Sequence, residues 1–435
     1  MLTFGGFLLL GGRLGDHFGH RRLFVAGILL FTAASLACGL STDKGFLVAA
    51  RAIQGLGGAI VSAVSLSLIV ALFVEPADRA KAMGVFGFVA AGGGTLGVLL
   101  GGVLTDLLDW HWIFLVNVPI GIAVSCLAPR ILPADRVSRS SGRLDAGGAV
   151  IVTAGLMLAV YAIVNGNQTG WLSGQTLGLL TGSAGLLVAF LAVESRVRSP
   201  LMPLGLFARR NLATANVVGI LWAAAMFAWF FLSALYLQLV LGYSPLQVGL
   251  AFLPANLIMA ALSLGLSAKL VMRFGIKPPL VVGLTLAGVG LALLARAPVH
   301  GHYVANLLPS MVLLGFGAGA AFNPMLLAAM GDVEPSEAGL ASGIVNTSFM
   351  MGGALGLAVL ASVAASRTNH LLVAGATHMS ALVGGYRVAF VIGAAFAIFA
   401  AVVSAQMLRP RAIEAATEAA SAASSREPAF ANGNL

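Results

Sequence analysis

Runs of apolar residues recur along almost the whole chain with short polar breaks between them, and all but the first are long enough to cross a membrane as a helix. Only 9% of the 435 residues are charged, and the mean hydropathy is +0.99. A soluble domain carries about 25% charged residues, so this chain cannot cover its surface with water-compatible side chains. Strands of a membrane barrel would alternate apolar and polar residues, and these runs do not. The sequence predicts an all-α polytopic membrane protein.

The first run, residues 1–12, differs from the others because it is too short to span a bilayer. Twelve helical residues rise about 18 Å, against a hydrocarbon core of about 30 Å. Full spans are expected at 23–40, 45–74, 82–105, 111–128, 146–164, 175–193, 212–240, 246–268, 279–296, 303–329, 339–365 and 384–407.

Most of the 24 Lys and Arg residues fall in alternate loops. Retained basic residues mark the cytoplasmic side, so the chain is expected to end there. The net charge of +9 is then a matter of topology and does not indicate nucleic-acid binding. Cys38 and Cys126 lie inside predicted spans of different hairpins and are expected to be small core residues.

The chain contains an internal repeat. Similar segments pair at nearly constant separation: Leu14–Arg21 with Leu270–Lys277, Gly55–Gly57 with Gly315–Gly317, Glu75–Gly84 with Glu334–Gly343, and Gly93–Gly97 with Gly352–Gly356. The spans at 146–164 and 175–193 have no partner in the other half. The counterpart of the span at 212–240 would precede Met1, so the repeat predicts that the first helix and part of the second are missing.

These relations predict two six-helix bundles joined by an inserted two-helix hairpin. The expected divisions are an N-terminal bundle at 1–128, a cytoplasmic linker at 129–145, the hairpin at 146–193, a second cytoplasmic linker at 194–211, a C-terminal bundle at 212–407 and a disordered cytoplasmic tail at 408–435. Parallel repeats of six helices are typical of secondary transporters.

Five segments carry a family resemblance. Gly12–Arg21 resembles the loop motif of the major facilitator superfamily, Arg51–Ala59 its R-x-x-Q-G helix motif, and Gly93–Gly102 its antiporter motif with Val98 in place of proline. Trp110–Gly121 and Tyr236–Pro245 resemble segments particular to the fourteen-helix branch. The chain therefore resembles that superfamily's fourteen-helix drug:proton antiporters, the EmrB/QacA subfamily.

The loop motif supplies the first candidate site: Gly12, Asp16, Gly19, Arg21 and Arg22. As a short polar turn, it lets Asp16 pair with a nearby arginine or accept N–H groups at the next helix start. The resemblance implies a conformational latch. The alternative is a solvated turn that only sets topology.

Arg51, Gln54 and Gly55 form the second candidate site. Arg51 is the only charge well inside a predicted span, where it costs about 2.5 to 3.5 kcal/mol without compensation. The resemblance implies proton coupling with a carboxylate on the first helix, yet all 15 Asp and Glu residues lie in loops, helix ends or the tail. Asp106 and Asp109 are the nearest. Alternatively, Arg51 snorkels to the outer interface.

Two further sets of residues complete the candidates. Small faces on one helix permit close contact and bending, and the resemblance implies an antiport role for Gly93, Gly97, Gly101 and Gly102. An apolar cavity for bulky molecules is expected to draw on Asn117, Asn216, Trp222, Met226, Phe230, Tyr236 and Gln238. The alternative for each is a lipid-facing aromatic or a helix-packing amide.

The resulting prediction is a secondary active transporter that exports lipophilic drugs or metabolites for protons by alternating access. It would be a monomer in the bacterial cytoplasmic membrane, with small lipophilic substrates, protons and lipid as partners. No metal, cofactor or nucleic acid is expected beyond the proton gradient. The alternatives are an inactive truncated or mis-started fragment and a metabolite exporter without drug specificity. An enzyme is disfavoured because all seven histidines lie in or beside loops.

Overall fold

The computed structural model describes residues 1–73, 75–133, 146–197, 200, 202–331, 333 and 338–409. Regular structure in these residues is entirely helical, with no strand. Ten helices of the described chain are long and apolar enough to cross a membrane. The all-α polytopic prediction is therefore confirmed. Most of the first predicted linker and most of the predicted tail lie outside the described residues.

Every predicted span coincides with a helix or a run of consecutive helices. The first part of the chain forms α1 (Leu2–Phe18), α2 (His20–Gly39), α3 (Lys44–Leu72), α4 (Pro76–Leu107), α5 (Trp112–Leu115), α6 (Asn117–Ile131), α7 (Ala146–Thr169) and α8 (Gly174–Glu194). The second part forms η1 (Leu204–Ala208), α9 (Arg210–Leu235), η2 (Tyr236–Val240), α10 (Pro245–Ala261), η3 (Leu262–Leu266), α11 (Ser267–Phe274), α12 (Lys277–Leu294), η4 (Tyr303–Leu307), α13 (Leu308–Met330), α14 (Ala338–Val373) and α15 (His378–Met407).

Local chemistry explains several helix starts. The Asp43 carboxylate accepts the Phe46 N–H at 2.9 Å and caps α3. Ser244 and Gln247 form a capping box at the start of α10, with Pro245 at the first helical position. These starts fall at the polar breaks, which is why the apolar runs located the spans.

The opening segment differs from its prediction. The run expected to end at residue 12 continues as helix to Phe18, and the connector to α2 is one residue, Gly19. Gly19 has φ 96 and Gly275, its repeat partner between α11 and α12, has φ 76. L-residues with a side chain rarely adopt these angles. The internal repeat therefore extends to the backbone conformation of the turn. The predicted length of the polar turn was wrong, because most of its residues are helical.

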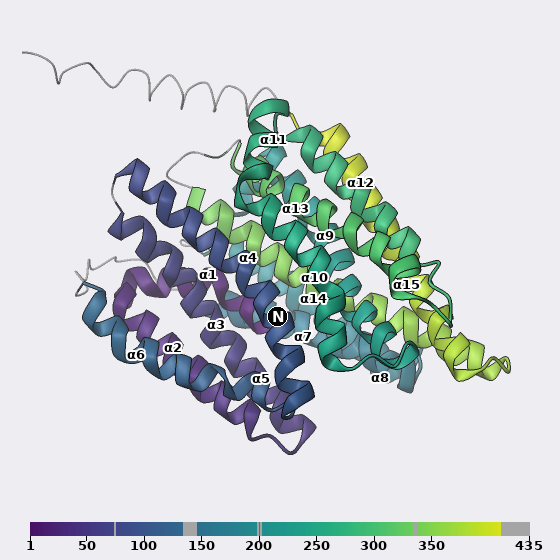
Figure 1. Ribbon diagram of the computed structural model, residues 1–435. Coiled ribbons are helices and arrows are strands. Elements are labelled where there is room, and N and C mark those ends of the chain that lie inside the picture. The colour runs from purple at the N-terminus through teal and green to yellow at the C-terminus, as the bar shows by residue number, and fades with distance from the viewer. Residues whose placement is uncertain are drawn as a thin grey trace, which may run out of the picture.

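The two halves meet through crosswise helix pairs. In Figure 1, α1, α2, α3 and α6 gather on one side and α9 to α15 on the other. α1 packs along α14, and α4 packs along α10. By the repeat, α1 corresponds to the end of α10 with η3 and α11, and α4 corresponds to α14, so the two contacts join corresponding regions of the two halves.

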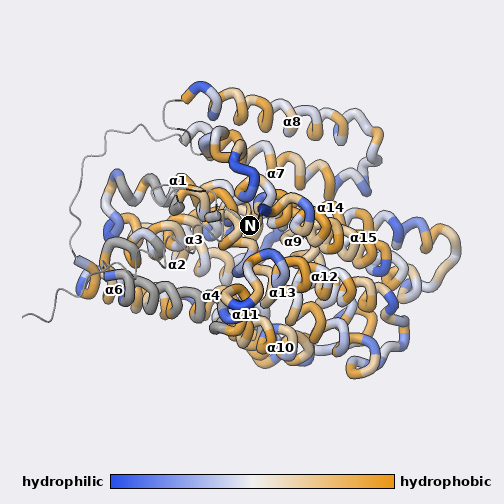
Figure 2. Tube along the Cα trace, turned by 90° about the horizontal axis from the view of Figure 1, so that it is seen from above, coloured by the Kyte–Doolittle hydropathy of each residue, from blue (hydrophilic) through white to orange (hydrophobic). Residues whose placement is uncertain are grey.

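The inserted hairpin lies at the edge of this arrangement. Figure 2 shows α8 on the outside, with α7 between it and the remaining helices. α7 packs against α1 of one half and α14 of the other. The Asn167 amide fixes α7 to α14, because its Nδ2 donates to the Ser362 carbonyl at 2.9 Å and to the Ser362 hydroxyl at 2.7 Å.

Among the described residues, the buried members of the largest hydrophobic core lie between Leu206 and Leu408, and Leu9 of α1 packs against them. A second, small cluster joins Leu10 of α1 to Ala149 of α7. Cys38 is buried as predicted, but Cys126 is exposed on α6, so its assignment to a core was wrong. The described helices do not cover that face of α6.

Candidate transport site

Arg51 lies two turns into α3 and is held by an amide and an aromatic ring. Its Nη1 donates to Gln54 Oε1 at 2.5 Å, and its guanidinium carbon lies 5.3 Å from the centroid of the Phe114 ring. Gln54 Nε2 in turn donates to Ser35 Oγ on α2 at 2.6 Å. Ser35 is 0% exposed and Gln54 4% exposed. The sequence motif contained Gln54, but it gave no signal for Ser35 or Phe114.

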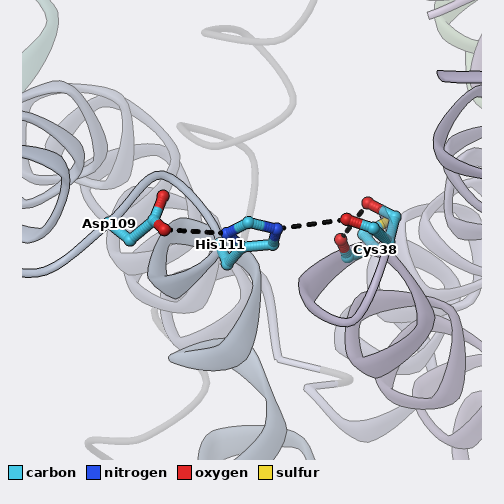
Figure 3. A network of polar contacts seen from close by, with 4 residues as sticks. Cys38, Asp109 and His111 are labelled. Carbon is cyan, nitrogen blue, oxygen red and sulfur yellow. Dashed lines mark hydrogen bonds and ion pairs between the residues drawn. The ribbon is translucent and has the colours of Figure 1, made fainter. Parts of the chain in front are cut away.

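No ion pair joins Arg51 to a carboxylate within the described residues. Asp109, one of the two acids named as nearest candidates for this role, pairs with His111, whose Nδ1 lies 3.2 Å from the Asp109 Oδ2 (Figure 3). The other ring nitrogen of His111, Nε2, lies 3.1 Å from the Ser41 carbonyl oxygen. The carboxylate partner of Arg51 that the resemblance implies stays a prediction.

Gly55 explains how α3 approaches α1. A Cβ at this position would overlap the Thr3 hydroxyl and lie 3.3 Å from the Phe4 nitrogen. Gly57 plays the same part against α2, where a Cβ would lie 2.7 Å from the Phe31 nitrogen. The glycines of this motif thus bring three helices together around the Arg51 network.

The predicted latch residues lie at the α1–α2 turn. Arg21 Nη2 donates to the Pro129 carbonyl at 2.5 Å and ties the turn to the end of α6. Gly12 lies in α1 with no described atom within 4 Å of an added Cβ. Arg22 is in the first turn of α2. The Asp16 side chain lies outside the described residues, so its pairing stays a prediction.

The antiporter-motif glycines have two kinds of surroundings. A Cβ at Gly102 would lie 2.7 Å from the Pro245 carbonyl oxygen, so α4 and α10 touch backbone to backbone. A Cβ at Gly101 would lie 3.9 Å from Ile113, whereas at Gly93 and Gly97 it would meet no described atom within 4 Å. Among these four glycines, Gly102 is the one at which the described residues leave no room for a side chain.

The predicted cavity residues do not form one group. Asn117 is on α6, where its amide donates to the Ile113 and Phe114 carbonyls, each at 3.2 Å. The other six lie on α9 and η2. Gln238 is exposed, and Met226 and Phe230 are half-buried. Their role in binding stays a prediction.

Three of these residues lie inside the C-terminal core. Trp222 and Asn216 are buried, and the buried Tyr236 hydroxyl donates to the Pro298 carbonyl at 2.6 Å. Several polar atoms nearby have no hydrogen-bond partner among the described residues: Asn216 Oδ1, Trp222 Nε1, Trp229 Nε1, Ser233 Oγ, Ser310 Oγ and Thr347 Oγ1. Each such atom costs about 1 to 3 kcal/mol, a penalty that water or a polar ligand would relieve.

A separate hollow of about 390 Å³ lies between the α7–α8 connection and the end of α14. It is lined by Trp171, Ser362, Val363, Ser366, Arg367, His370 and Val388. None of the predicted cavity residues reaches it.

The profile of the family described as Major Facilitator Superfamily matches residues 1–357. This chain belongs to the major facilitator superfamily. It is 40% identical over 421 residues to the puromycin resistance protein pur8 of Streptomyces alboniger, an alignment that covers 96% of this chain and 83% of that protein. It is 39% identical over 372 residues to the cephamycin export protein CmcT of Amycolatopsis lactamdurans, covering 85% and 76%.

Solved structures agree on the superfamily fold. The POT family transporter PepTSo matches with a TM-score of 0.63 at 17% identity, covering 95% of this chain and 88% of that one. At this identity the likeness concerns the fold alone. The family resemblance inferred from the motifs is confirmed. The chain is a multi-span membrane transporter of the bacterial major facilitator type.

Proposed function

We propose that this superfamily member exports small lipophilic antibiotics or related metabolites across the cytoplasmic membrane in exchange for protons, by alternating access. Two relatives support the substrate class, because their names state puromycin resistance and cephamycin export. The Arg51–Gln54–Ser35 chain carries the proposal for coupling, since it holds a permanent charge within the N-terminal half. The basic loops and the end of α15 face the cytoplasm, and the chain acts as a monomer.

The contact between the halves supports the rocking motion. α1 with α14 and α4 with α10 form two symmetry-related seams, and a rotation of one half against the other would open one end of both seams together. At Gly102 the α4 backbone lies directly on α10, so this point can act as a pivot.

The C-terminal half supports substrate binding. Trp229, whose Nε1 has no hydrogen-bond partner among the described residues, packs against Phe230 and Phe252, with ring centroids 4.3 Å and 6.1 Å away. Aromatic surface with a few polar groups suits amphiphilic molecules of the antibiotic type. Movement of the two halves apart would expose the aromatic surface and the polar groups to the substrate.

The experiment uses purified protein in inside-out proteoliposomes with an acidic lumen. Puromycin uptake above the level of empty liposomes is expected, and collapse of the pH gradient with a proton ionophore should abolish it. Uptake that survives the ionophore would remove proton coupling. Absence of uptake for puromycin and for a panel of chemically distinct antibiotics would overturn the export proposal.

A further inference from the structure

His111 joins two separate connections at one end of the N-terminal half. It follows Asp109 in the α4–α5 connection, and its ring reaches the α2–α3 turn (Figure 3). Its Nδ1 lies 3.2 Å from Asp109 Oδ2, and its Nε2 lies 3.1 Å from the Ser41 carbonyl oxygen. Ser41 is 2% exposed and is itself fixed, because its hydroxyl donates to the Cys38 carbonyl at 2.7 Å. The distribution of basic loops places this end outside the cell.

Both partners of the imidazole ring are hydrogen-bond acceptors. An ionised carboxylate and a main-chain carbonyl have no proton to donate. A neutral imidazole has one N–H and one lone pair, so it can donate to one partner while its other nitrogen faces an oxygen lone pair. The imidazolium donates to both. The geometry therefore fits the protonated side chain, with the Asp109 carboxylate as counter-charge.

We propose that His111 is a proton-binding site on the outer face, which holds an external proton between Asp109 and Ser41. A proton delivered by hydronium adds to the ring lone pair, an N–H bond forms and water is released, with no change of oxidation state. The protonated ring ties the α4–α5 connection to the α2–α3 turn. Loss of the proton removes one of the two hydrogen bonds and frees the turns from each other.

The surroundings connect this site to Arg51. The Trp110 ring stacks on the imidazole with centroids 3.7 Å apart. Phe114, which lies one helical turn after His111, carries the Arg51 guanidinium over its ring. A movement of the α4–α5 connection therefore changes the contact that holds Arg51. A role in coupling rests on the proposed antiport, whereas the proton site itself rests on geometry alone.

The helices and turns that meet at the site carry other charged or titratable groups. They are Asp106 at the end of α4, Cys38 on α2, Asp43 and Lys44 at the start of α3, and Arg51 farther along α3. Histidine is the side chain that ordinarily changes charge between pH 5 and 8. The test therefore compares the protein at a pH below this range with the protein at a pH above it.

The test measures the separation of the two connections directly. Spin labels are placed at Thr42→Cys and Leu107→Cys, both exposed, in a Cys126→Ser background. The distance distribution is expected to be narrow at pH 5.5 and broad at pH 8.5. Asp109→Asn removes the counter-charge and should lower the pH at which the distance distribution broadens.

Three variants decide the outcome. His111→Gln should abolish the pH response, while the matched control His300→Gln, in an exposed loop, should keep it. His111→Arg retains donors and a permanent charge and should give a narrow distribution at every pH, which keeps the proposal testable if His111→Gln fails to fold. A pH response that persists in His111→Gln or His111→Arg overturns the proposal, as does a wild-type distribution that is independent of pH.

The same variants separate this proposal from the proposed function. The label measurement requires no transport. If puromycin uptake ignores the pH gradient while the label response follows His111, antiport fails and the proton site stands. If uptake follows the gradient and the label response does not depend on His111, antiport stands and the proton site is overturned.

Discussion

Helices α4 and α14 carry the same glycine pattern in the two halves, but its surroundings differ. In α14, a Cβ at Gly352 would lie 2.8 Å from the Ile220 Cα, and one at Gly356 would overlap Ala224. A Cβ added at their repeat partners in α4, Gly93 and Gly97, would meet no described atom within 4 Å. The glycine pattern thus permits close approach of another helix, and in the C-terminal half α14 packs closely against α9 through it.

The two halves of the molecule therefore differ in how their helices pack. The C-terminal half has one large core, and Gly352 and Gly356 of α14 lie against α9, a helix of that core. The N-terminal half packs through the Arg51 motif, and an added Cβ at Gly93 or Gly97 of α4 would meet no described atom within 4 Å. We interpret the first as the rigid body of the transporter and the second as the half that carries the coupling machinery.

The largest expected effect breaks the packed glycine face. Gly356→Leu should lower the free energy of unfolding by about 3 kcal/mol, because the new side chain must enter the α9 contact. The matched change Gly97→Leu should leave it almost unaltered. Thermal unfolding of both variants in detergent checks the comparison. Equal destabilisation would mean that both faces are packed, and the contrast between the halves would be lost.

A second pair of changes tests where the halves are alike. Gly19→Ala and Gly275→Ala should each cost about 2 kcal/mol, since both residues adopt positive φ at equivalent turns. Gly12→Ala, within α1, is the control and should be neutral or slightly stabilising. Denaturation curves give the three values. A neutral Gly275→Ala beside a costly Gly19→Ala would show that the turns are not equivalent.

A smaller effect is expected in the Arg51 network. Removal of the Gln54–Ser35 hydrogen bond should cost about 1 kcal/mol, and a double-mutant cycle with Gln54→Ala and Ser35→Ala should show coupling of similar size. Ser65, whose hydroxyl donates to Val61 of its own helix, serves as the control partner and should show none. If the effects of Gln54→Ala and Ser35→Ala are additive, the Gln54–Ser35 hydrogen bond does not contribute to stability.

The spans and the repeat could be predicted from sequence because bilayer thickness dictates the length of apolar runs. The turn glycines could be predicted as a repeated pair, since their position requires a residue without a side chain. The extent of α1 was missed because Arg13 and Gly15 read as a turn, whereas the helix continues to Phe18.

Contacts between distant elements could not be predicted in the same way. Phe114 over Arg51 and His111 against Ser41 join segments more than sixty residues apart, and only packing decides which side chains meet. Likewise, the sequence placed Trp222 and Tyr236 in an expected cavity and did not indicate that both are buried in the C-terminal core.

The central claim is that the N-terminal half couples proton movement to export through Arg51. The most direct measurement compares Arg51→Ala with Arg296→Ala, an exposed arginine in a loop, for gradient-driven puromycin uptake in the same proteoliposomes. We predict at least a tenfold loss for Arg51→Ala, normal uptake for Arg296→Ala and intact membrane insertion for both. Undiminished, gradient-dependent uptake by Arg51→Ala would contradict the account.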